Sequence, residues 1–108
     1  MNRYIRGIDA CANEIGCRPE VFAQYYRYLL DYSYKEEDGS SHNLMATYHV
    51  GEDFLDIVDG LRAIDEVMLF CGIYSGCRLG HALALGINTE TIINIKGMFW
   101  LCQDRIFR

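Results

Sequence analysis

Two histidines and a glutamate stand at positions where they could carry out metal-assisted chemistry. His49 and Glu52 belong to the segment H-V-G-E, in which the flexible Gly51 lets the carboxylate fold back toward the imidazole. Neutral histidine binds zinc, and a glutamate in a confined site can transfer protons near neutral pH. His81, in R-L-G-H-A-L-A-L, offers a second imidazole farther along the chain. Because a His-x-x-Glu pair is common by chance, its spacing alone does not identify a functional site, and its place in the fold must also be considered.

The strands that must position these residues are separated by helical and polar segments. An alternation of apolar with small or charged residues predicts a first strand over residues 4–11. Pro19 suits the first turn of a helix, and the polar segment K-E-E-D-G-S-S over residues 35–41 predicts a solvated loop. A second strand over residues 44–50 then delivers His49 at its carboxyl end.

Two amphipathic helices are predicted from apolar residues that recur at three- and four-residue spacing. Asp53 is the expected cap of the second helix, and Gly60 inside it costs about 1 kcal/mol relative to alanine. Residues 78–85 predict a third strand with His81 inside it, and Thr89 is expected to cap a terminal helical segment over residues 89–108. The predicted apolar stripes are Val21, Phe22, Tyr25, Leu29 and Tyr32 in the first helix, and Leu55, Val58, Leu61, Ile64 and Met68 in the second.

This order of strands and helices predicts an α/β fold with parallel strands joined by right-handed crossovers. In such a fold the carboxyl ends of the strands lie at one edge of the sheet. The polar residues near Asn13, His49 and His81 are therefore expected to gather there. Active sites of α/β barrels form at this edge.

Three segments resemble the middle of the adenosine deaminase family, in the same order and with similar spacing. They are G-I-D-A-C-A-N-E (7–14), Y-H-V-G-E-D-F-L-D-I-V-D-G-L-R-A-I-D-E (48–66) and R-L-G-H-A-L-A-L-G-I (78–87). That family is a zinc-dependent branch of the amidohydrolase barrels. The resemblance, strongest over residues 7–88, implies one partial TIM-type (β/α)8 barrel domain over residues 1–108, with about three β/α units corresponding to family strands four to six.

The resemblance also implies roles for individual residues. His49 matches the H-x-G-E histidine that ligates the catalytic zinc, and Glu52 matches the glutamate that protonates a purine ring nitrogen. His81 matches the histidine that orients and helps to deprotonate the attacking water. Ala12 stands where the family has a glycine whose backbone N–H contacts the purine. Ala12 and Gly51 are therefore the expected substrate-binding residues. The implied activity is hydrolytic deamination of adenosine or a related purine.

Part of the family's zinc site has no match in this sequence. The missing ligands are an H-x-H pair and an aspartate that ends the last strand, and a complete barrel takes about 250 residues, whereas this sequence has 108. We expect this chain alone to bind zinc weakly or not at all and to deaminate little, unless self-association or a complementing chain completes the site. The alternative is a non-catalytic remnant or assembly module.

Composition excludes some other functions. A net charge of −5 with ten scattered basic residues argues against binding of a nucleic-acid duplex. No apolar segment approaches the roughly 20 residues that cross a bilayer, and no secretory signal is evident, so a cytoplasmic location is expected. Five cysteines without a C-x-x-C pair indicate buried, reduced thiols.

Three further patterns have simpler explanations than a binding site. A structural zinc site from Cys71, Cys77 and His81 lacks the usual C-x-x-C spacing. His42 adjoins the polar loop and is expected to be solvated. The tyrosines between residues 25 and 34 are expected to pack or to form an oligomer face rather than to stack on bases.

Overall fold

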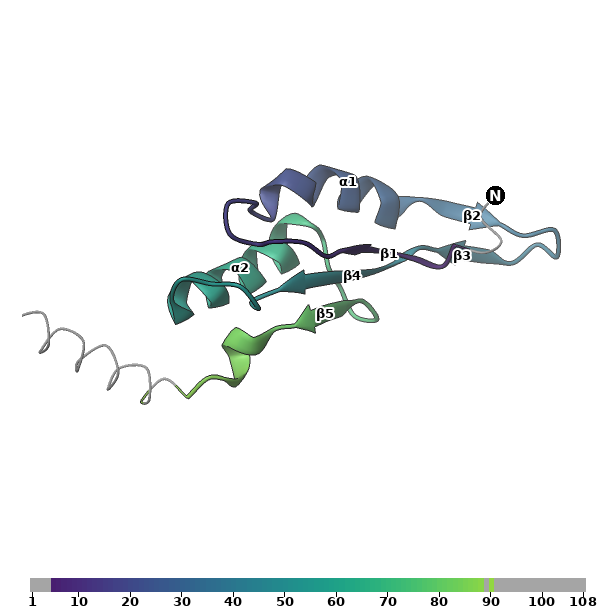
Figure 1. The fold of residues 1–108 in the computed structure, drawn as a ribbon. Helices are drawn as coiled ribbons and strands as arrows, with labels where there is room; N and C mark the ends of the chain where they lie inside the picture. The colour runs from purple at the N-terminus through teal and green to yellow at the C-terminus, as the bar shows by residue number, and fades with distance from the viewer. Residues whose placement is uncertain (1–4, 89, 91–108) are drawn as a thin grey trace, which may run out of the picture.

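A small parallel β-sheet with two helices forms the centre of the molecule (Figure 1). The computed structural model describes residues 5–88 and residue 90. The sheet has the order β1–β4–β5, with β1 at Gly7–Ala10, β4 at Met45–Val50 and β5 at Arg78–His81. Both strand pairs are parallel, which confirms the predicted α/β fold with parallel strands.

Each crossover between parallel strands carries one helix. Helix α1, Glu20–Asp31, follows β1, and helix α2, Ile57–Phe70, joins β4 to β5. Among the described residues, no helix combines the length and the apolar character needed to cross a membrane.

An antiparallel hairpin lies between α1 and β4. Strand β2, Ser33–Lys35, pairs with β3, Ser41–Asn43, and the turn between them is closed by Gly39 N–H, which donates to Glu36 O at 3.0 Å. The sequence predicted only a loop over residues 35–41; the structure places this segment at the tip of a hairpin that extends away from the parallel sheet (Figure 1). Polar composition hid the pairing because both strands have only three residues and those of β3 are exposed.

Both helices pack on one face of the sheet. Tyr26 of α1 and Tyr48 of β4 have ring centroids 5.2 Å apart, and the Tyr26 hydroxyl donates to Thr47 O at 2.9 Å. Burial raises the pKa of both tyrosines and raises the pKa of the Cys71 thiol to about 11, so these groups stay uncharged near neutral pH. The buried cluster comprises Tyr26, Leu30, Ala46, Tyr48, Val50, Ala63, Ile64, Val67, Cys71 and Ala84.

The predicted buried stripes of the helices are partly wrong. Ile64 is buried as predicted, but most of the other predicted stripe residues are half-buried or exposed, and small residues such as Ala63 bring α2 close to the sheet instead. In α1 the buried residues are Tyr26 and Leu30. Each helix carries apolar residues on more than one face, so spacing alone could not identify the face that meets the sheet. The predicted stripe residues that are exposed are Val21, Tyr25, Tyr32, Leu55, Val58, Leu61 and Met68.

Two predicted boundaries also differ from the structure. Helix α2 begins after Asp56, whose side chain accepts from Asp59 N–H at 2.9 Å, so the predicted cap at Asp53 is wrong. Strand β5 ends at His81 rather than continuing to residue 85, and Leu83–Gly86 form a 3-10 helix, η1.

The remaining predictions concern Gly60 in α2 and a helical segment over residues 89–108. Gly60 does not break α2: an added Cβ would lie 2.8 Å from the Ala84 Cβ, so the glycine allows close packing. The predicted terminal helix over residues 89–108 lies outside the described residues, except for Glu90.

The described cysteines are unpaired and differ in exposure. Cys71 is buried as predicted, and Cys17 and Cys77 are half-buried. Cys11 is exposed, so the prediction of a buried thiol is wrong there. Its exposure follows from its place just beyond the end of β1, at the edge of the sheet where the predicted site residues gather.

Candidate functional site

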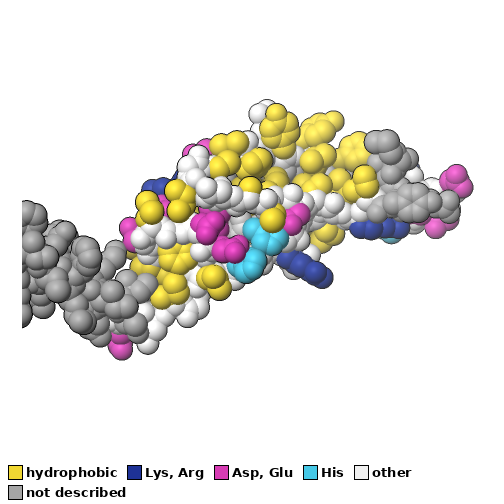
Figure 2. All heavy atoms as spheres, viewed as in Figure 1, with side chains coloured by type: hydrophobic (Ala, Val, Ile, Leu, Met, Phe, Trp, Pro, Cys, Tyr) yellow, Lys and Arg dark blue, Asp and Glu magenta, His cyan; other side chains and the backbone are white. Residues whose placement is uncertain are grey.

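The carboxyl ends of β1, β4 and β5 bring the predicted histidines together. In the sheet register His49 lies opposite Gly80, and Val50 lies opposite His81. The two imidazole ring centroids are 5.4 Å apart. Figure 2 shows histidine side chains beside acidic side chains on this face of the molecule.

An acidic residue on β1 orients His49. The Nδ1 atom of His49 is 3.0 Å from Oδ1 of Asp9, and the His49 side chain is only 24% exposed. When Nδ1 carries the proton, it donates to this carboxylate and leaves Nε2 as the acceptor that can bind a cation. Sequence reasoning did not select Asp9; its signal was an acidic residue in an otherwise apolar or small strand segment, G-I-D-A.

A glycine on β5 provides the space for the His49 ring. A Cβ added at Gly80 would lie 2.6 Å from Cγ and 2.7 Å from Nε2 of His49, well inside van der Waals contact. The imidazole can therefore lie here only because residue 80 has no side chain.

We expect Gly80→Ala to lower the free energy of unfolding by about 1–3 kcal/mol and to displace the His49 ring, because the new methyl group overlaps it. Urea denaturation and the NMR signals of the His49 imidazole nitrogens measure the two effects. Gly86→Ala is the matched control: a Cβ there meets nothing within 4 Å, so a change below about 0.5 kcal/mol is expected. Equal effects of the two substitutions would contradict this steric explanation.

Glu52 and His81 form a second acid–imidazole pair. The Nδ1 atom of His81 is 2.9 Å from Oε2 of Glu52, and the side chains of His81 and Glu52 are 51% and 41% exposed.

The backbone at the end of β5 determines the direction of the His81 side chain. Strand alternation would place His81 on the helix-packed side with Val50. However, His81 and Ala82 have φ of 58° and 47°, and this left-handed backbone ends β5 and turns the chain into η1. Such angles are uncommon for residues other than glycine and are concentrated at functional sites.

Glu14 holds the loop that carries Glu52. Its carboxylate accepts from the N–H groups of Gly51, Glu52 and Asp53 at 2.7, 2.8 and 3.1 Å. Gly51 is buried with φ +72°, and an added Cβ would lie 2.6 Å from Ile64 Cδ1. The loop therefore requires glycine at this position. The assignment of Gly51 to substrate binding stays a prediction, and its own N–H is already engaged by Glu14.

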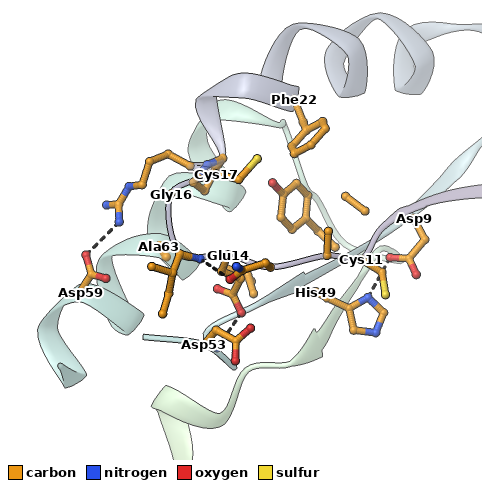
Figure 3. A pocket seen from close by; sticks show the side chains of 18 of the residues that line it. Asp9, Cys11, Glu14, Gly16, Cys17, Phe22, His49, Asp53, Asp59 and Ala63 are labelled. Atoms are coloured by element: carbon orange, nitrogen blue, oxygen red, sulfur yellow. Dashed lines mark hydrogen bonds and ion pairs between the residues drawn. The ribbon is translucent and has the colours of Figure 1, made fainter. Parts of the chain in front are cut away.

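A pocket of about 530 Å³ lies between the end of β1, the start of α1, β4 and α2. Ala12 and His49 are among its lining residues, whereas Gly51, Glu52 and His81 are not. Figure 3 shows Asp9, Cys11 and His49 at one end of this pocket and Asp59 at the other.

The far end of the pocket is charged as well. The Arg18 guanidinium donates to Asp59 at 2.9 Å, and this bond raises the pKa of Arg18. The pocket is within the size range of small-ligand sites and combines an apolar aromatic floor with charged ends.

The donors available for zinc only partly match the set that the resemblance to adenosine deaminases implies. The Nδ1 atom of His49 contacts the Asp9 carboxylate, and zinc-ligating histidines are usually held by such a contact. Within residues 5–88 and 90, the group of donors close enough to share an ion is Asp9, Cys11 and His49. Cys71, Cys77 and His81 do not form such a group in this part of the chain.

Comparisons with known proteins add no relative. No model of a known protein family matches the chain, and no curated protein gives a significant match to its sequence. A function for this chain is therefore inferred from its residues, their geometry and the three segments that resemble adenosine deaminases.

Proposed function

We propose that residues 7–88 provide the middle of a zinc-dependent hydrolase site that deaminates adenosine or a related purine. The observation that supports this most strongly is the meeting of His49, Glu52 and His81, from two consecutive β/α units, at one edge of the sheet. The imidazole centroids of His49 and His81 are 5.4 Å apart, and Glu52 lies 2.9 Å from His81. A proposed metal ligand, His49, therefore lies beside two groups that could transfer protons, Glu52 and His81.

Hydrolytic deamination adds water to the ring carbon that bears the amine and releases ammonia. One group must take a proton from the water and another must give a proton to the ring nitrogen. His81 serves as the proton acceptor and Glu52 as the donor, and their direct contact allows a proton to pass between them. His49 would hold zinc through Nε2, and bound zinc would supply the positive charge that makes water more acidic.

We infer that further polypeptide completes this site, and the open edges of the sheet support this. Within the described residues, β1 and β5 each pair only with β4, so each has an open edge. Open strand edges recruit other strands. A second polypeptide, or further sequence of the same one, that extends the sheet could bring the missing ligands to the edge where His49 lies.

The test is a single-chain hybrid in which residues 7–88 replace the corresponding segment of an adenosine deaminase. The expected result is ammonia release from adenosine that requires zinc, with little or no release by the present chain alone. A folded hybrid that binds zinc and releases no ammonia would contradict the proposed function. Turnover by the chain alone would contradict the expectation that its zinc site is incomplete.

An assembly role without catalysis is the second candidate. It is supported by exposed apolar residues on α1, in which Tyr25 and Tyr28 are 70% and 71% exposed. Val21 near the start of the helix and Tyr32 just after its end are exposed as well. Clustered exposed aromatic side chains are typical of interaction surfaces. An inactive, zinc-loaded hybrid together with self-association of the present chain in sedimentation experiments would favour this candidate.

A further inference from the structure

The exposed Cys11 thiol lies beside the Asp9 and His49 pair. One ligand atom from each of these three residues falls within 4.8 Å of the other two. Figure 3 shows the three side chains together at one end of the pocket. The adenosine deaminase resemblance assigns no role to Cys11.

The sheet register explains why these side chains meet. Asp9 pairs with Thr47 and Ala10 with Tyr48, so the next step of the register brings Cys11 beside His49. Asp9 and Cys11 are two residues apart, and alternate residues of an extended chain project to the same face. The carboxylate, the thiol and the imidazole therefore lie on the side of the sheet opposite the helices.

The donor atoms lie close to the spacing that a shared metal ion requires. Zinc binds sulfur at about 2.3 Å and nitrogen or oxygen at about 2.0 Å, which puts its donors about 3.5 Å apart in tetrahedral geometry. Asp9 and Cys11 are exposed, and the Asp9 carboxylate already lies 3.0 Å from the His49 ring.

We propose that Asp9, Cys11 and His49 bind a thiophilic divalent metal ion, with zinc as the natural occupant. A thiolate together with an imidazole selects zinc over magnesium and calcium, which prefer oxygen donors only. On binding, the Cys11 S–H bond breaks, its proton passes to solvent and sulfur bonds to the metal. Three protein donors leave a fourth position open.

This metal site deepens the proposed function and rests on it for the role of His49 as a ligand. It adds two donors, Asp9 of β1 and Cys11 just after β1. A site with these added donors would bind metal in the present chain more tightly than His49 alone. Metal binding is measured separately from deamination, so the two proposals can fail independently.

Cobalt(II) titration of the whole chain, followed by absorption spectroscopy, tests the site. Bound cobalt is expected to give a thiolate-to-metal charge-transfer band in the near ultraviolet, and zinc is expected to displace it. Cys11→Ser should abolish the band, and both Cys11→Ser and His49→Gln should weaken cobalt binding at least about tenfold. Cys17→Ser is the matched control and should keep the band, because the half-buried Cys17 is outside the donor group.

Circular dichroism of each variant checks that it is folded, and the exposed position of Cys11 predicts an unchanged spectrum. A band that persists in Cys11→Ser, or no band in the folded wild-type chain, would overturn the proposal. A band that depends on Cys11, with no ammonia release by the zinc-loaded hybrid, would support the metal site and contradict the deaminase function.

Discussion

Replacing Glu52 by glutamine is expected to lower ammonia release from adenosine by the hybrid by about 10²–10⁴-fold. Glutamine keeps the size of the side chain but cannot donate a carboxylic acid proton, and general acid catalysis contributes a factor of this order. The substitution also replaces the carboxylate that contacts His81 at 2.9 Å. Initial rates of ammonia release at saturating zinc measure the effect.

The matched control for this prediction is Glu37→Gln. Glu37 is exposed in the turn between β2 and β3, outside the sheet edge that carries the histidines, so the rate should not change. If Glu52→Gln deaminated adenosine as fast as this control, Glu52 would not be the proton donor.

Glu14→Ala is expected to lower the free energy of unfolding by about 2–3 kcal/mol. The substitution removes a carboxylate that accepts three backbone N–H groups, and hydrogen bonds to charged groups each contribute roughly 1.5–3 kcal/mol without being additive. The buried N–H of Gly51 loses its partner, while those of Glu52 and Asp53 can turn to water. Urea denaturation measures this loss as a lower midpoint at constant slope.

Glu37→Ala again serves as the control and should change the free energy of unfolding by less than about 0.5 kcal/mol. The Glu14 substitution should also make the loop over residues 51–53 exchange its amide protons faster. An unchanged midpoint together with unchanged exchange would show that the carboxylate does not hold the loop.

The sequence predicted the parallel α/β arrangement because its local patterns are clear. Residues 44–50 form a short, mainly apolar segment, and helical spacing begins soon after Glu52, so the sequence favours a strand followed by a helix. The same patterns placed His49 at the end of a strand, where the structure has it in β4. The TIM-type barrel, the zinc and the purine substrate stay predictions of the family resemblance.

Other features depend on long-range packing and could not be predicted from spacing. Gly80 makes room for a ring on the neighbouring strand, and Glu14 binds backbone groups 37 to 39 residues away. The end of β5 depends on left-handed angles at His81 and Ala82, neither of which is glycine. Cys11 was counted among the buried thiols because an isolated cysteine gives no sign of the neighbours that the sheet brings to it.

His49 and His81, from adjacent strands, are proposed to face one metal-binding site, and the function depends on this arrangement. Zinc titration of the chain, followed by NMR of the imidazole nitrogens, is the sharpest test of it. We expect the largest shift at His49, a smaller shift at His81 because the ring centroids are 5.4 Å apart, and no early shift at His42 in the hairpin strand β3. A first shift at His42, with His49 unchanged, would contradict the shared site.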